Sequence, residues 1–295
     1  MTIGPRPAAD VVAGASLVHA LLREQHADLA HLVPVKAAEG WDNALFRLGD
    51  ELAVRLPRRA ASAKLIEHEQ RWLPHLSARL PVPVPVPVRI GVPGPLFGWA
   101  WSVVRWLPGR TLLHAAPPDP VSTGTVLERF LHALHQPAPA DAPLNPFRGV
   151  PLEARTAALH GHLQQLGGAV DRAAVLAVWD LALAAPPWPG PPLWLHGDLH
   201  PGNLLVGDGR LTGVIDFGDL TSGDPATDLA VRWMLPPRMR ERFAAWTAGD
   251  QPDASRMRAR GWALALGLAC LAHSRDDADM ASLGQRTVIA ALNEP

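Results

Sequence analysis

The sequence is short of several residue types, and each shortage narrows what the protein can be. Among its 295 residues the only cysteine is Cys270, so no internal disulfide can form and we expect a reducing compartment. The formal net charge is −1 and 19% of the residues are charged, which argues against the basic surface that a nucleic-acid partner requires. Tyrosine is absent, but with 31 prolines and 25 glycines this reflects an alanine- and proline-rich composition and decides little about chemistry.

Long hydrophobic runs are missing as well. The longest apolar helix candidate, Trp262 to Ala272, is too short to cross a bilayer. The first residues, Met1 to Pro5, lack a basic segment followed by an apolar run, so no signal peptide is expected. We therefore expect a cytoplasmic protein with no membrane and no nucleic-acid partner, either a monomer or a homodimer. Its length allows one large or two modest domains.

The most informative stretch of the chain is residues 193–230. Two short apolar runs, Leu204–Val206 and Leu211–Ile215, are separated by a Gly-Asp-Gly turn, which predicts a β-hairpin. The hairpin would bring Asn203, at the start of its first strand, close to Asp216, at the end of its second.

Three oxygen-bearing side chains then converge on one spot, because Asp198 lies in the loop just before the hairpin. Carboxylate and amide oxygens are hard ligands that can hold Mg²⁺ on the phosphates of a nucleotide, which indicates Asn203 and Asp216 as the metal ligands. The carboxylate of Asp198 is left to face an attacking hydroxyl, as a catalytic base would.

The spacing is that of the kinase catalytic loop and its metal aspartate: His196-Gly-Asp-Leu-His-Pro-Gly-Asn203, followed by Asp216-Phe-Gly. Glycine follows the histidine where protein kinases have arginine, and His-Pro-Gly follows the aspartate. In these features the chain resembles the aminoglycoside phosphotransferase family of small-molecule kinases. The resemblance extends from about residue 30 to the C-terminus and is most specific over residues 194–230.

The resemblance implies an α+β fold with two lobes, like that of protein kinases. Residues 1–104 would form an N-terminal nucleotide-binding lobe, an antiparallel sheet with one helix. Residues 105–109 would form a hinge, and residues 110–295 a larger, mainly α-helical lobe for catalysis and substrate binding. The implied reaction moves the γ-phosphoryl group of ATP, or of GTP, to a hydroxyl of a small molecule, with Mg²⁺ as the second cofactor.

The apolar pattern along the chain is compatible with this division. It predicts helices over 11–29 and 61–76, and strands over 32–36, 44–48, 52–56 and 98–104. The alternating Pro-Val repeat over 81–88 forbids a central strand and indicates an extended segment at a sheet edge. After the hinge the pattern is helical, with helices predicted over 121–135, 151–166, 171–184, 238–248, 256–272 and 280–292.

The resemblance also assigns nucleotide contacts in the N-terminal lobe. Arg55 stands where the family usually has a phosphate-binding lysine, and arginine can bind phosphate bidentately. Its carboxylate partner should come from the next helix, where the apolar spacing favours Glu69 over Glu67. The neighbouring Arg58 and Arg59 are expected to be surface charges.

Weaker expectations concern the phosphates and the nucleobase. The turn over 39–43 would cover the phosphates through Asn43 or a backbone amide, although a plain hairpin turn explains the same residues equally well. Backbone amides around Val104 and Trp106, at the place of the hinge, would bind the edge of the nucleobase. Asp228 would hold the backbone of the catalytic loop in shape.

Other readings of these residues stay open. His196, Asp198 and His200 could form a zinc cluster, and the Gly-Asp-Leu-His sequence resembles one box of the metallophosphoesterases. A nucleotide-binding module without turnover is a third possibility.

The identity of the phosphate acceptor is open too. An antibiotic is the leading candidate, as in a resistance enzyme. A metabolic alcohol such as methylthioribose, choline, homoserine or a sugar is close behind. The aspartates over 276–279 could receive ammonium groups of a substrate, although a solvated helix-start cluster is the favoured explanation.

Overall fold

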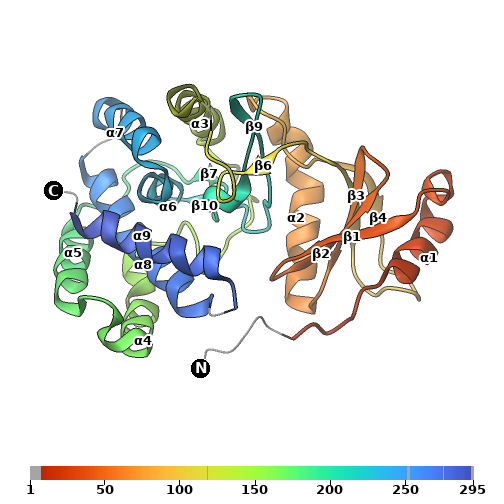
Figure 1. The fold of residues 1–295 in the computed structure, drawn as a ribbon, viewed down its shortest axis with the longest axis horizontal. Helices are drawn as coiled ribbons and strands as arrows, with labels where there is room; N and C mark the ends of the chain where they lie inside the picture. The colour runs from red at the N-terminus through yellow and green to blue at the C-terminus, as the bar shows by residue number, and fades with distance from the viewer. Residues whose placement is uncertain (1–7, 118, 251–252, 275, 294–295) are drawn as a thin grey trace.

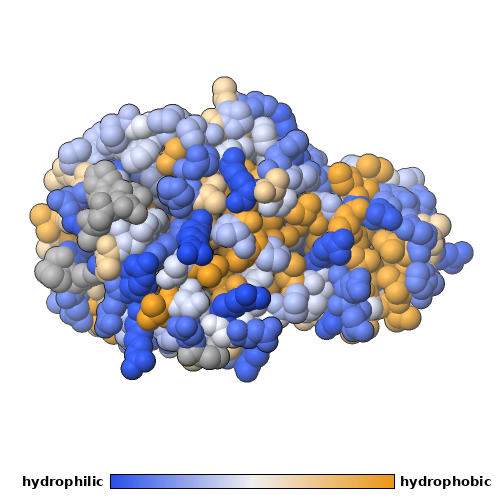
Figure 2. Space-filling view, turned by 90° about the horizontal axis from the view of Figure 1, so that it is seen from above, coloured by the Kyte–Doolittle hydropathy of each residue, from blue (hydrophilic) through white to orange (hydrophobic). Residues whose placement is uncertain are grey.

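The computed structural model describes residues 8–117, 119–250, 253–274 and 276–293. The chain forms a smaller lobe built on a sheet and a larger lobe built from helices, lying side by side (Figure 1). This confirms the predicted two-lobed α+β fold. On the face drawn in Figure 2, hydrophobic residues gather around the region where the two lobes meet.

The smaller lobe is a five-stranded antiparallel sheet with the order β1-β2-β3-β5-β4. Its strands are β1 Pro34–Glu39, β2 Asn43–Leu48, β3 Leu52–Pro57, β4 Pro87–Gly91 and β5 Trp101–Arg105. Two helices belong to this lobe instead of one, α1 Ala15–Gln25 and α2 Ala60–Ser77. The opening helix was expected only as a surface helix, but it contributes to the lobe's core because Val18, Leu21 and Leu22 are fully buried.

The first strand differs from its predicted bounds. The expected range was 32–36, whereas β1 begins at Pro34 and continues to Glu39 with a bulge between Lys36 and Ala38. Small alanines at this point carry little strand preference of their own, so pairing with β2 decides where the strand ends.

The Pro-Val repeat over 81–88 contacts both lobes. Its end enters β4, the edge strand of the sheet, as expected for a proline-containing strand. Upstream, the carbonyl of Pro83 accepts a hydrogen bond from the amide of Val214 (3.1 Å), and the side chains of Val82 and Val84 join the core of the helical lobe.

The larger lobe is assembled around one long helix, α8 Asp253–His273, which packs against the four helices α4, α5, α6 and α9. The α-helices of this lobe are α3 Pro120–Leu134, α4 Thr156–Leu166, α5 Arg172–Ala184, α6 Ala226–Leu229, α7 Pro237–Asp250, α8 and α9 Ala278–Asn293. The predicted helix over 151–166 is divided into a 3₁₀ turn, Leu152–Arg155, and α4. Within the described ranges, no helix has the length and apolar content needed to cross a membrane.

Short strands bring the catalytic segment to the lobe boundary. These strands are β6 Arg110–Thr111, β7 Leu193–Leu195, β8 Leu204–Gly207, β9 Arg210–Val214 and β10 Thr221–Gly223. Strands β8 and β9 form the predicted hairpin, with Asp208 and Gly209 in its turn. Both turn residues have positive φ angles (49° and 81°), the conformation that a two-residue hairpin turn requires.

Candidate active site

The loop that follows β7 is fixed through its backbone. The carboxylate of Asp228, fully buried in α6, accepts hydrogen bonds from the amides of His196 (2.8 Å) and Gly197 (2.9 Å). His135 lies 3.1 Å from the same carboxylate. Burial raises the pKa of Asp228, but the hydrogen bond to His135 and its charge outweigh this effect, so the net shift is downward. Asp228 therefore acts as an anionic anchor for the loop, as the family resemblance implied.

Two residues at the start of this loop are constrained by packing. Gly197 has φ 85°, and a Cβ there would lie 2.2 Å from the carbonyl oxygen of Asp219, so only glycine fits. The ring of His196 is turned into the protein, with Nε2 3.0 Å from the carbonyl of Ile215 and its ring centre 4.5 Å from that of Phe217, at a tilt of 51°. This removes His196 from the zinc cluster considered above. In the described ranges, no group of three or more His, Cys, Asp or Glu side chains is placed to hold a metal ion.

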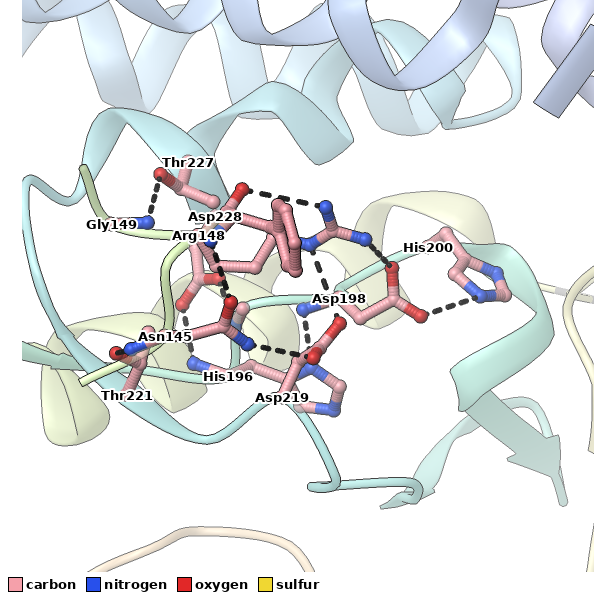
Figure 3. Close-up of polar contacts among 12 residues, drawn as sticks. Asn145, Arg148, Gly149, His196, Asp198, His200, Asp219, Thr221, Thr227 and Asp228 are labelled. Carbon is pink, nitrogen blue, oxygen red and sulfur yellow. Dashed lines mark hydrogen bonds and ion pairs between the residues drawn. The ribbon is translucent and has the colours of Figure 1, made fainter. Parts of the chain in front are cut away.

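Asp198 is held from two sides at the centre of Figure 3. Its Oδ1 lies 3.2 Å from Nη2 of Arg148, and its Oδ2 lies 3.6 Å from Nε2 of His200. Its side chain is 35% exposed, so one part still faces solvent. Burial raises the pKa of Asp198, but the hydrogen bond and charge of His200 and the charge of Arg148 lower it further than burial raises it. The carboxylate is therefore ionised and oriented.

Arg148 and its partners were missed by the sequence reasoning. The guanidinium of Arg148 also lies 3.4 Å from Asp219, which in turn accepts a hydrogen bond from Asn145 Nδ2 (2.8 Å). Asp219 directly follows Asp-Phe-Gly, a position that could have drawn attention. Arg148 and Asn145 lie in a proline-rich loop without periodicity, and the amide of Asn145 donates to the hydroxyl of Thr221, 76 residues away (2.9 Å).

Asn203 and Asp216 are brought together by the hairpin. The amide of Ile215 donates to the carbonyl of Asn203 (3.0 Å), which continues the β8–β9 pairing up to the residue before Asp216. Asn203 Nδ2 donates to the carbonyl of Asp198 (2.9 Å), so the side-chain oxygen of Asn203 is the atom that could ligate a cation. Asp216 has φ 62°, an uncommon conformation for this residue type, and its side chain is 55% exposed.

Arg55 links the two lobes. From β3, its Nη1 donates to both carboxylate oxygens of Glu69 on α2 (2.8 and 2.7 Å), and its Nη2 lies 3.1 Å from Asp216. Arg55 and Glu69 are both buried. Burial raises the pKa of Glu69, and the charge of Arg55 opposes that rise. A cation is thus braced beside the candidate metal ligand, with Glu69 and not Glu67 as its partner.

The turn between β1 and β2 corrects the expectation for Arg58. This side chain is only 8% exposed, donates to the carbonyl of Gly40 (2.9 Å) and pairs with Glu39 (2.9 Å). These two contacts hold the turn in place. Arg59 reaches Asp42 across the same turn (2.6 Å). Asn43 is the first residue of β2, and its Oδ1 is buried without a hydrogen-bond partner among the described residues.

Some backbone groups at the predicted hinge already form hydrogen bonds within the sheet. Val104 lies within β5, between β3 and β4. The amide of Trp106 donates to the carbonyl of Glu51 (2.7 Å). The antiparallel pairing of the sheet thus continues one residue beyond β5, and the amide of Trp106 already has an acceptor within the chain. Binding of a nucleobase by the backbone at the hinge stays a prediction.

The sequence profile of the Phosphotransferase enzyme family matches residues 35–263, which include every residue of the constellation above. The chain belongs to this family. Among curated relatives, an aminoglycoside 3'-phosphotransferase of Escherichia coli is 25% identical over 168 residues, or 54% of this chain. The match spans 62% of that relative's length. The uncharacterized protein YcbJ of Bacillus subtilis is 42% identical over 45 residues, 15% of each chain.

Solved structures of other members show the same fold. A GDP and kanamycin complex of APH(2")-IIIa superposes with a TM-score of 0.72 at 18% identity, covering 93% of this chain and 97% of that one. A complex of APH(4)-Ia with AMP-PNP and hygromycin B gives a TM-score of 0.62 at 18% identity, covering 94% and 98%. At this level of identity the likeness concerns the fold alone.

In this phosphotransferase family member, the aspartates over 276–279 lie at the start of α9. This is the explanation that the sequence favoured. Oδ1 of Asp277 accepts a hydrogen bond from the amide of Met280 (3.1 Å) in the first turn of α9. Asp279 lies 3.0 Å from Nε2 of His114. Two of these carboxylates thus have partners within the chain.

Proposed function

We propose that this chain is a kinase that transfers the γ-phosphoryl group of ATP or GTP to a hydroxyl group of a small molecule. The observation that carries the proposal is the convergence of Asp198 and Asn203 from the catalytic loop, Asp216 from the end of the β8–β9 hairpin, and Arg55 from β3. Catalysis of phosphoryl transfer consists mostly of positioning and charge neutralisation, and this constellation offers both.

In this proposal Asn203 and Asp216 hold Mg²⁺. Their side chains offer hard oxygen donors, and the carboxylate of Asp216 is exposed. When bound, the ion would neutralise negative charge on the phosphates. Arg55, braced by Glu69, would supply a fixed positive charge on the same phosphates.

Asp198 has the role of the catalytic base. A carboxylate whose pKa is lowered is a weak base, so its main task is to orient the acceptor hydroxyl and to receive the proton late in the reaction. His200 and Arg148 fix the direction in which this carboxylate points.

The nucleotide would lie between the lobes. We propose residues 1–104 as the nucleotide-binding lobe, residues 105–109 as the hinge and residues 110–295 as the catalytic lobe. Asn43, with its unpaired buried oxygen, marks the turn beside the phosphates. Around Val104 and Trp106, backbone amides of the hinge other than that of Trp106 would bind the edge of the nucleobase.

For the acceptor we propose an antibiotic hydroxyl, since curated relatives such as the one of Escherichia coli are named aminoglycoside 3'-phosphotransferase. A metabolic alcohol is the second candidate. The short segment between Asp216 and Asp228 offers no platform for a peptide substrate, which supports a small molecule in either case. The single cysteine and the need for nucleoside triphosphate favour the cytoplasm as the site of action.

The proposal is tested by Mg²⁺-dependent consumption of ATP and GTP against a panel of antibiotics and small alcohols, with mass spectrometry to detect the added phosphoryl group. A phosphorylated product that Asp198→Asn does not form, while the exposed-site control Asp180→Asn does, would support a kinase. Stabilisation by Mg-nucleotide with no product from any compound would point to a binding module. Release of phosphate from model esters with Zn²⁺ and no nucleotide would favour the hydrolase.

A further inference from the structure

A cavity of about 710 Å³ lies in the helical lobe beside the catalytic loop. One of its walls is Pro201, in the loop between Asp198 and Asn203. Another is formed by Leu112 and Leu113, just after the hinge segment. The amide of Leu113 donates to the carbonyl of Pro201 (3.1 Å), so this wall is tied directly to the catalytic loop.

The cavity is lined mainly by apolar side chains. They come from the segment after β6, from the 3₁₀ turn Ala230–Met234 and the prolines that follow it, and from α9; examples are Leu112, Leu113, Trp233, Met234, Ile289 and Ala290. Ile289 remains 49% exposed at this wall, although large aliphatic side chains are usually buried. A ligand that covers these groups gains most from its own apolar surface.

The charged residues of the lining are Arg240, Glu241 and Arg286, that is, two guanidinium groups and one carboxylate. A compound with several ammonium groups loses hydration on entry, and carboxylates are the partners that compensate best for this loss. The lining supplies one carboxylate, Glu241. Asp277 and Asp279 are not among the lining residues; Asp277 caps α9 and Asp279 pairs with His114.

At the reacting end of the site the carboxylates already have a cationic partner. The guanidinium of Arg148 is 3.2 Å from Asp198 and 3.4 Å from Asp219, so one buried cation already partners both carboxylates. An ammonium group beside the acceptor hydroxyl would have to compete with Arg148 for them.

We propose that this cavity receives the body of the acceptor and that the acceptor is a hydroxyl compound with a bulky apolar body and no cluster of ammonium groups. The inference rests on the proposed kinase function and deepens it: it names the class of acceptor that the lobe selects. Apolar burial supplies the affinity, and the catalytic loop next to Pro201 receives the hydroxyl.

The test measures binding apart from turnover. Isothermal titration calorimetry in the presence of Mg²⁺ and AMP-PNP compares two probes, erythromycin with its apolar ring and single amine, and kanamycin with several amines. We expect erythromycin to bind at least about tenfold more tightly than kanamycin at physiological salt, because the cavity rewards apolar area and offers few carboxylates.

Two variants locate the binding site. Ala290→Phe fills the cavity and should weaken erythromycin binding by about tenfold, while Gln285→Phe, exposed on the same helix and outside the lining, should leave it unchanged. Ile289→Glu places a carboxylate at an exposed position and should shift the preference toward kanamycin without disturbing the fold.

Tighter binding of kanamycin, no binding of erythromycin, or equal binding by wild type and Ala290→Phe would overturn the inference. Its failure is distinguishable from failure of the kinase proposal. Phosphorylated kanamycin as the main product would keep the kinase and reject the apolar acceptor. Erythromycin binding that is sensitive to Ala290→Phe, without phosphoryl transfer to any compound, would keep the cavity assignment and reject the kinase.

Discussion

The two halves of the candidate site are fixed by different kinds of contact. In the helical lobe, Asp228 accepts two backbone amides, so the catalytic loop is held through its main chain. In the sheet lobe, Arg55 is held by the side chain of Glu69 and by Asp216 of the other lobe. The contacts of the first half lie within one lobe, whereas the second half depends on a few charges and on the distance between the lobes.

The largest expected effect comes from removing the main-chain anchor. Asp228→Ala leaves the buried amides of His196 and Gly197 without an acceptor, so the free energy of unfolding should fall by about 3 kcal/mol and turnover should be lost. Urea denaturation and the kinase assay measure the two effects. The control is Asp180→Ala, at an exposed position on α5. A loss of stability no larger than that of the control would mean that the loop does not depend on Asp228.

The side-chain half should be more tolerant. Arg55→Met should lower kcat/KM for the nucleotide by about 100-fold, because the cation beside the phosphates is lost, whereas Arg55→Lys should stay within about tenfold of wild type. Steady-state kinetics with varied Mg-nucleotide checks this, with melting curves to separate loss of fold from loss of function. If Arg55→Met and Arg55→Lys behave alike, the charge at this position does not serve the nucleotide.

The same difference explains what the sequence could and could not predict. Asp198, Asn203 and Asp216 lie on one hairpin and the loop before it, so fixed spacing alone brings them together. Arg148 contacts Asp198 from 50 positions away, on an irregular loop that hydrogen bonds to distant residues help to fix, and no local pattern marks it. Arg58 was misjudged for a related reason: burial by a neighbouring turn cannot be read from two adjacent arginines.

A smaller effect is expected from Arg148, whose role is to position Asp198. Arg148→Met should lower kcat by about tenfold with little change in the KM for nucleotide, because Asp198 loses one of its two supports while the phosphate contacts remain. Arg148→Lys should recover most of the rate, since a cation returns between Asp198 and Asp219. A larger change in the KM for nucleotide than in kcat would contradict a positioning role.

The smallest effect concerns His162, which pairs with His273 (3.1 Å) near the end of α8. Burial, with the charges of His273 and Arg155, lowers the pKa of His162 to about 4. The unfolded chain takes up the proton first as pH falls, so stability should decline from about pH 6.5 toward pH 4. The full pKa difference corresponds to about 3 kcal/mol, and because solvent screens a partly buried ring we expect a loss of about 1–2 kcal/mol. His162→Gln should flatten this part of the pH profile in urea denaturation, and His160→Gln, exposed on α4, should not.

The central claim is that Asp216 and Asn203 hold the metal–nucleotide complex while Asp198 serves the acceptor. It is tested most directly by measuring Mg-nucleotide affinity and turnover for Asp198→Asn and Asp216→Asn side by side. We expect Asp198→Asn to keep wild-type affinity for Mg-nucleotide and to lose turnover. We expect Asp216→Asn to lose affinity for Mg-nucleotide itself. Equal affinity in both variants, or undiminished turnover by Asp198→Asn, would contradict it.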